Sequence, residues 1–301
     1  MTPALTAALI ASALAASEPA TGTQLYANRI ALAAADDACA LFSRPERALL
    51  DALTARSRDD AARAGDAPAT LDRFEASHTV PRPSCTRDAI TIEAERHRQH
   101  ADALAQTHEI AFPGVYQDWI SERRDRGAPL WRVRQSDHLR TAVLGIHAGE
   151  DADTLALALR SATAPAFAVI TVRNPALQAA PLDFTAGGLL PSPYENALSA
   201  WGGASGTLRR ISASARLDPD MAARLAPAGG VGAYGFAFPD AAILALRALT
   251  PREGVRIDLV GGRGQVVETL WFEVGMFNAA LAVQALELPQ PEPAPAVTAS
   301  R

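Results

Sequence analysis

The chain has 301 residues, of which 49% are hydrophobic and 20% are charged, and its formal net charge is −5. This length accommodates two ordinary domains, and the composition is that of a globular protein with enough apolar material for its cores. The negative charge argues against nucleic acid as a partner, because nucleic-acid-binding proteins usually carry a basic face. All 28 basic residues are arginine, which together with abundant alanine indicates a GC-rich genome rather than a guanidinium-based function.

The first residues predict an export signal. An apolar core covers residues 4–16, and it is too short to cross a bilayer because a spanning helix needs about 20 residues. A small-residue cleavage site ends at Ala15 and the polar Ser17 follows, although no basic residue precedes the core. The alternative is an alanine-rich helix of a cytoplasmic protein, or a misplaced start codon. We expect residues 1–16 to be a signal peptide of a periplasmic or otherwise exported protein, and we expect no transmembrane segment.

Helical periodicity dominates the first third of the chain. It predicts helices over residues 23–42, 44–65, 69–78 and 86–110. Ser43 and Glu46 form a capping box before the second of these helices, since their side chains can satisfy N–H groups that have no partner within the helix. Residues 17–112 are therefore expected to form a small helical bundle.

The two cysteines lie at the ends of two expected helices. Cys39 is near the end of the first helix, and Cys85 precedes the last one. A disulfide between them would close a loop of about 46 residues and stabilise the fold by roughly 4 kcal/mol on the chain-entropy estimate. The alternatives are two unrelated buried thiols or a redox pair, but no C-x-x-C spacing supports a redox pair. For an exported protein we expect the structural disulfide.

The apolar period changes from about 3.6 to 2 near residue 130, which predicts a second domain over residues 130–288. Residues 113–129 are expected to be a connector with one helical piece at 116–126. Short apolar or alternating runs in this part of the chain predict strands. They cover residues 131–135, 141–146, 167–173 and 210–217, with turns rich in Gly and Pro between them. Such a pattern favours an antiparallel sandwich or a partly open barrel, and residues 174–206 are expected to be a long loop.

The most consistent local signals lie in residues 236–288. They predict a short helix, a β-hairpin with a glycine-rich turn at 261–264, and an apolar closing helix that begins at Phe277. The core candidates here are Val255, Ile257, Leu259, Leu270, Phe272 and Phe277. The expected fold class is therefore α+β, with a disulfide-tied helical bundle before a mainly antiparallel β domain that ends in a helix. The Pro-rich residues 289–301 are expected to be a disordered tail.

Three side chains on the last helix of the expected bundle are candidate metal ligands. Glu93, His97 and His100 have the spacing i, i+4 and i+7, so they share one helical face and could converge on an ion. His97 also falls in the apolar stripe of the helix, where a half-buried histidine commonly packs with one hydrogen bond. No H-E-x-x-H motif is present. We therefore expect packing and predict no metal and no cofactor.

Three further motifs suggest chemistry but lack the necessary context. Gly230, Gly232 and Gly235 match G-x-G-x-x-G, but the residues that follow do not begin a helix, as a dinucleotide site requires. The polar cluster at 147–153 does not match a calcium loop and is expected to be a solvated turn. Residues 203–207 fall one residue short of a nucleophile elbow. The acids expected in turns or helix caps are Asp218, Asp220 and Asp240.

Short motifs around the C-terminal hairpin match the pattern of a known family. They are residues 246–250, the turn at 261–264 and the F-x-x-A-L sequence at 277–281, while residues 131–133 have the form W-x-V. In these features the chain resembles the invasion-associated locus B family of exported α-proteobacterial proteins. Members usually have a cysteine soon after the Trp, where this chain has Gln135. The resemblance implies a mostly β envelope domain without a known catalytic centre, and it assigns no functional residue.

These observations favour a non-enzymatic protein of the Gram-negative envelope that binds a partner protein or an envelope component. The alternative is a small-ligand-binding or hydrolytic site at the junction of the two domains, next to the loop 174–206. A pocket of His or acid side chains with shifted pKa values would favour hydrolysis. An exposed apolar patch without such groups would favour binding.

Overall fold

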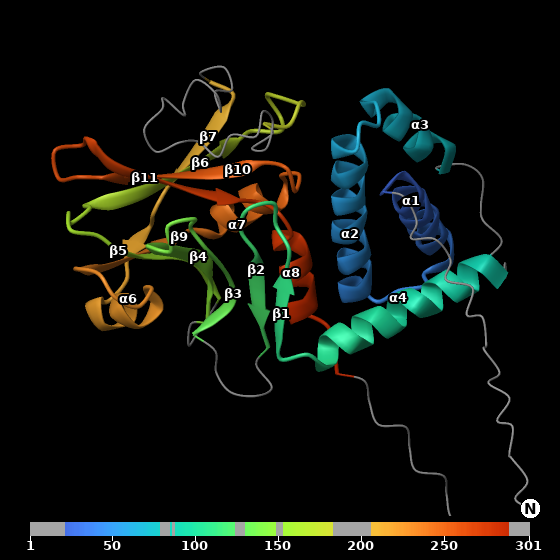
Figure 1. Cartoon of the computed structure of the whole chain (residues 1–301), viewed down its shortest axis with the longest axis horizontal. Coiled ribbons are helices and arrows are strands. Elements are labelled where there is room, and N and C mark those ends of the chain that lie inside the picture. Colours follow the sequence, from blue (N-terminus) through green and yellow to red (C-terminus); the bar gives the residue numbers. More distant parts are fainter. Residues whose placement is uncertain are drawn as a thin grey trace, which may run out of the picture.

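A computed structural model of the chain gives the fold, which contains both helices and sheets (Figure 1). It describes residues 22–78, 85, 88–123, 130–148, 153–182 and 206–288. Within them the sheets are antiparallel and the α+β class is confirmed. The expected signal peptide (1–16), most of the expected loop (183–205) and the expected tail (289–301) lie outside the described residues. No helix in the described ranges is long and apolar enough to cross a membrane.

The first helices of the chain match their predicted positions closely. They are α1 (Gly22–Cys39), α2 (Arg44–Arg63), α3 (Pro68–His78) and α4 (Asp88–Gln106). In Figure 1, α1 and α3 lie beside α2, and α4 lies across one end of α2. The sequence predicts that the last helix continues to residue 110. It ends at Gln106 instead, because the next residues pair as a strand.

Local hydrogen bonds hold the corner between α1 and α2. The Ser43 N–H donates to the Glu46 carboxylate at 2.7 Å, which is part of the predicted capping box. The Asp36 carboxylate accepts from the Phe42 N–H at 2.9 Å and pairs with Arg47 at 2.8 Å. The direction in which α2 leaves α1 is therefore fixed by side chains close in the sequence.

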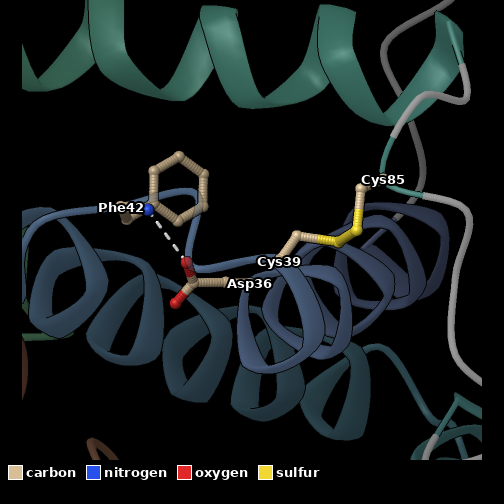
Figure 2. The surroundings of a disulfide bond; sticks show 4 residues. All are labelled: Asp36, Cys39, Phe42 and Cys85. Carbon is tan, nitrogen blue, oxygen red and sulfur yellow. Dashed lines mark hydrogen bonds between the residues drawn. A yellow bond between two sulfur atoms is a disulfide. The ribbon is translucent and has the colours of Figure 1, made fainter.

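Cys39 and Cys85 form the predicted disulfide. Their Cα atoms are 5.8 Å apart, and their sequence separation is 46 residues. Figure 2 shows the bond beside the hydrogen bond between Asp36 and Phe42, at the end of α1. Because α2 and α3 lie within the closed loop, the disulfide restrains the whole helical segment.

Two antiparallel sheets follow the helices. The larger has the strand order β1-β2-β3-β4-β5-β9-β8, and the smaller has the order β11-β10-β6-β7. The larger sheet consists of β1 (Glu109–Phe112), β2 (Trp119–Glu122), β3 (Trp131–Ser136), β4 (Ala142–His147), β5 (Thr154–Arg160), β9 (Ala233–Phe238) and β8 (Ala215–Arg216). The smaller sheet consists of β6 (Phe167–Arg173), β7 (Leu208–Ser212), β10 (Gly254–Val260) and β11 (Val266–Glu273).

The sheets differ from the sequence prediction in several places. The sequence predicts a helical piece at 116–126, whereas residues 119–122 form strand β2 with alternating burial. The larger sheet begins with β1 at Glu109, where the sequence predicts that the last helix continues to residue 110. The sequence predicts one strand over 210–217, but the chain leaves the smaller sheet after Ser212 and joins the larger one at Ala215. Strand β5 also carries no prediction of its own.

One apolar core connects the helices with both sheets. It contains Leu49 of α2, Leu144 of β4, Ile257 of β10, Phe272 of β11 and Phe277. The last of these residues begins α8 (Phe277–Gln284), which contacts β2 and β3 on one side and α2 on another. Figure 1 shows α8 between the strands and α2. The six core candidates of the C-terminal region, Val255, Ile257, Leu259, Leu270, Phe272 and Phe277, are all buried.

Candidate functional site

A cleft lies where α2 meets α8 and the end of α7 (Asp240–Arg247). Its volume of about 480 Å³ is within the range of small-molecule sites. The lining comprises Arg44, Pro45, Ala48, Asp51, Ala52 and Ala55 from α2, Arg247 from α7, and Asn278, Leu281, Ala282 and Ala285 from α8 and its end. The cleft therefore lies at the junction between the helical segment and the segment that carries the sheets.

Two guanidinium groups of this lining have no ion-pair partner within the described part of the chain. They belong to Arg44, at the start of α2, and Arg247, at the end of α7, and both side chains are exposed. The lining also contains one acid, Asp51, which pairs with Arg47 at 2.9 Å. The cleft consequently has an excess of positive charge.

Hydrogen bonds fix the wall formed by α8. The Asn278 side-chain Nδ2 donates to the Arg247 carbonyl oxygen at 3.1 Å, which joins the first turn of α8 to the end of α7. The Ser121 hydroxyl of β2 donates to the Ala280 carbonyl oxygen at 3.1 Å, and it accepts from Gln284 Nε2 at 2.7 Å. This wall is therefore held both by α7 and by the larger sheet.

The opposite wall, α2, is anchored at both ends. Asp59 near its C-terminal end is 2% exposed and accepts from the backbone N–H and the Nε–H of Arg252, each at 2.9 Å. Near its N-terminal end, the Glu46 carbonyl oxygen accepts from His97 Nε2 at 2.9 Å. These contacts tie α2 both to α4 and to the turn before β10, so both ends of this wall are held in place.

The candidate metal ligands on α4 have separate surroundings. His97 is buried, and its ring packs edge-on against Phe42 with centroids 4.8 Å apart. Glu93 pairs with Arg96 at 2.5 Å, and His100 is exposed. Over the ranges that the structure describes, no three His, Cys, Asp or Glu side chains are arranged to hold a metal ion.

The buried His97 should make stability depend on pH. Burial lowers the pKa of its ring below the usual value of 6.5, so the unfolded chain binds the proton more readily than the folded one. As the pH falls below about 6.5, the free energy of unfolding should therefore decrease, and the decrease should end at the lower pKa of the folded state. Each pKa unit by which the folded state favours the neutral ring changes the free energy of unfolding by about 1.4 kcal/mol.

Urea unfolding of wild type and of His97→Gln across this pH range measures the effect. The variant should lose part of the pH dependence, whereas His108→Gln, at an exposed position, should keep it. Identical pH profiles for wild type and His97→Gln would show that the buried ring is not the cause.

The glycine motif lies at a strand and not at a helix. Gly235 is within β9 and pairs with Ala158 of β5. A Cβ atom at this position would lie 2.7 Å from a methyl carbon of Leu217. Glycine is therefore needed for a close side-chain approach, and the arrangement lacks the helix start that cradles a dinucleotide phosphate.

The acids expected in turns and caps, and His147 of the polar cluster, have structural roles in the described residues. The Asp218 carboxylate accepts from the Asp220 N–H at 2.9 Å and caps α6 (Pro219–Leu225), while Asp240 lies in the first turn of α7. His147 Nδ1 donates to the Leu130 carbonyl oxygen at 2.9 Å. Residues 149–152 and 203–205 lie outside the described residues.

Two acids from distant parts of the chain approach each other near the start of β11. Burial and the charge of Asp137 raise the pKa of the Glu268 carboxyl group, and the Ser161 hydroxyl lies 3.5 Å from its Oε2. Neighbouring acids in a partly buried setting can form an acid–base site. Asp137, however, accepts from the backbone N–H groups of Thr141 and Ala142 at 2.6 and 2.7 Å. Its carboxylate is thus engaged in holding the turn after β3.

Three residues of the cleft were not predicted as site residues from the sequence. They are Arg44, Arg247 and Asn278. One signal is nevertheless present, because Asn278 is a single polar residue within the apolar run 276–283. The arginines carry no such signal, since exposed arginines occur along the whole chain.

The side chains of the cleft are suited to recognition. A guanidinium group stays charged near neutral pH and offers several fixed donors. The alanine and leucine side chains beside it supply an apolar wall. Comparison with models of protein families, with curated proteins and with solved structures finds no match to this chain.

Proposed function

We propose that this protein is exported to the periplasm of a Gram-negative bacterium and binds a partner or an envelope component there without catalysis. The observation that carries the proposal is the cleft between α2 and α8, with two guanidinium groups free of ion pairs in the described chain. The disulfide supports export, because such bonds persist in oxidising compartments. The resemblance of the C-terminal region to the invasion-associated locus B family supports the same location.

The proposal includes the architecture. The helices α1–α4 act as a bundle that ends at Gln106, and the two sheets, which begin at Glu109, pack as a sandwich or a partly open barrel. The shared core supports this arrangement, since side chains of both sheets meet in it. The helix α8 is then the contact element between the two parts, which places the binding cleft at their junction.

A small-ligand-binding or hydrolytic site at this junction is the second candidate. The cleft volume of about 480 Å³ favours it, because a pocket of that size encloses a drug-sized molecule. Between these two activities the lining favours binding. Its arginine, amide and apolar side chains suit ligand binding and do not exchange protons near neutral pH, and its one acid, Asp51, is paired with Arg47.

The N-terminal sequence of the protein purified from its own cells tests the export part. We expect the mature chain to begin near Ser17, after the small-residue cleavage site. A mature chain that still begins at Met1 contradicts export but leaves the cleft proposal open.

Blocking the cleft tests the binding part. The tryptophan of Ala55→Trp fills the cleft at a half-buried lining position, and Ala69→Trp adds the same side chain at an exposed position of α3. Thermal unfolding is measured with and without the small-molecule fraction of a periplasmic extract. Wild type and Ala69→Trp should be stabilised by the extract, because a ligand that binds only the folded state raises its stability. An equal response of Ala55→Trp would show that binding occurs elsewhere.

A further inference from the structure

We infer that the cleft between α2 and α8 binds a small organic anion, in which a carboxylate or phosphate group is attached to a short apolar group. The inference rests on the proposed binding function and specifies the chemistry of the ligand. Three properties of the cleft support it: the charge of its rim, the character of its walls, and its size.

The charge of the rim favours an anion. Arg44 and Arg247 present guanidinium groups whose planar donor pattern matches the oxygens of a carboxylate or a phosphate. Arg44 is also at the N-terminal end of the 20-residue helix α2, where the helix dipole adds partial positive charge. Asp51 is the one acid of the lining and contacts Arg47 at 2.9 Å, so the lining has two arginines against one acid.

The walls favour a ligand with an apolar part. Ala48, Ala52 and Ala55 of α2 face Leu281 and Ala282 of α8 across the cleft, and these side chains carry no polar atom. Water against this surface is released when an apolar group replaces it. Inorganic anions such as phosphate or sulfate would leave this wall hydrated, so the expected ligand is amphipathic.

Neutral and cationic molecules fit the cleft less well. A neutral apolar molecule would remove water from the two guanidinium groups without replacing their hydrogen bonds, which costs free energy. A cation would be repelled by both groups. The volume of about 480 Å³ limits the occupant to a small molecule or to the end of a larger one.

Isothermal titration of the full mature chain at low ionic strength tests the inference. The probes are hexanoate, hexyl phosphate, hexanol and hexylammonium, which share one apolar group and differ in charge. At least one of the two anions should bind about tenfold or more tightly than hexanol and hexylammonium. The tighter of the two anions identifies the head group as carboxylate or phosphate.

Arginine variants locate the binding site. Arg44→Gln and Arg247→Gln should each weaken binding of the preferred anion by about tenfold or more, since each removes a charged hydrogen-bond donor. The matched control is Arg263→Gln, which removes an exposed arginine in the β10–β11 turn, outside the cleft. It should bind the anion like wild type. Thermal unfolding without probe confirms that all three variants are folded.

The contrary outcomes separate this inference from the proposed function. If neither hexanoate nor hexyl phosphate binds more tightly than hexanol, or if neither anion binds at all, the anion inference is overturned. The response of the cleft-blocked variant to the extract still decides whether the cleft binds something else. Anion binding that Arg44→Gln and Arg247→Gln leave unchanged places the anion outside the cleft, and that result also overturns the inference.

Discussion

Replacing Glu253 by glutamine should lower the free energy of unfolding by about 3–5 kcal/mol. Glu253 is 1% exposed, and its two carboxylate oxygens accept from Nε and Nη2 of Arg173 at 2.6 and 2.7 Å. Arg173 is itself 4% exposed. Glutamine keeps the shape of the side chain but removes the negative charge, so a guanidinium group remains buried without its counter-charge.

This ion pair also organises three segments of the chain. Arg173 ends strand β6, and its Nη1 donates to the Gln178 carbonyl oxygen at 2.5 Å. Glu253 accepts from the Thr250 N–H at 2.9 Å, in the turn that follows α7. The loss of the charge should therefore loosen both the beginning of the loop after β6 and the turn before β10.

Urea unfolding of the variant is compared with a matched exposed pair. Glu93 pairs with Arg96 at 2.5 Å, but the two side chains are 43% and 68% exposed. Glu93→Gln should cost less than about 1 kcal/mol, because solvent screens an exposed ion pair. If Glu93→Gln and Glu253→Gln lower the free energy of unfolding equally, burial does not determine how much the pair between Glu253 and Arg173 contributes.

The elements that the sequence predicts correctly are those determined by nearby residues. Ser43 and Glu46 lie three residues apart, so the start of α2 is visible without tertiary information. The β10–β11 hairpin likewise follows from alternating apolar residues around a glycine-rich turn. The disulfide between Cys39 and Cys85 was predictable for another reason, because two cysteines in a chain expected to be exported leave one possible pairing.

Strand β2 was missed because distant residues determine it. Ser121 is fully buried, and its hydroxyl can be buried because it donates a hydrogen bond to the Ala280 carbonyl oxygen of α8. Next to the strand, the buried Arg123 donates to the carbonyl oxygens of Val283 and Leu286 at 2.8 and 3.0 Å. Polar residues of this kind suggest a solvated helix when the sequence is considered alone. In the fold they bind carbonyl oxygens of α8 and of the residues after it, and Val283 among them lies in the last turn, where helix carbonyl groups lack an intrahelical partner.

The cleft could not be predicted for a related reason. Its two arginines lie on α2 and α7, and they line one cleft only because α8 packs against both helices. Periodicity shows which face of a helix is apolar, but it does not show which helix will cover that face. An alternative site is expected from the sequence at the junction of the two parts, and the cleft lies there.

Replacing Cys39 and Cys85 by serine should lower the free energy of unfolding by about 4 kcal/mol. This value follows from the chain entropy that a cross-link removes from the unfolded state when it closes a loop of this length, 46 residues. Urea unfolding measures it, and wild type treated with a reductant should behave like the double variant. The reductant should not change the double variant. A loss well below about 2 kcal/mol would mean that the unfolded helical segment is already compact without the bond.

The shared core determines how the double variant should unfold. Leu49 and Ala52 of α2 belong to the same apolar cluster as Ile257 and Phe272 of the smaller sheet. Asp59 of α2 also pairs with Arg252 in the turn before β10. Melting α2 alone would expose part of this core and leave a buried charge unpaired, so helices and sheets should unfold in one transition at a lower urea concentration. Separate transitions for helix and sheet signals would contradict this, and they would show that the disulfide, not the core, makes unfolding cooperative.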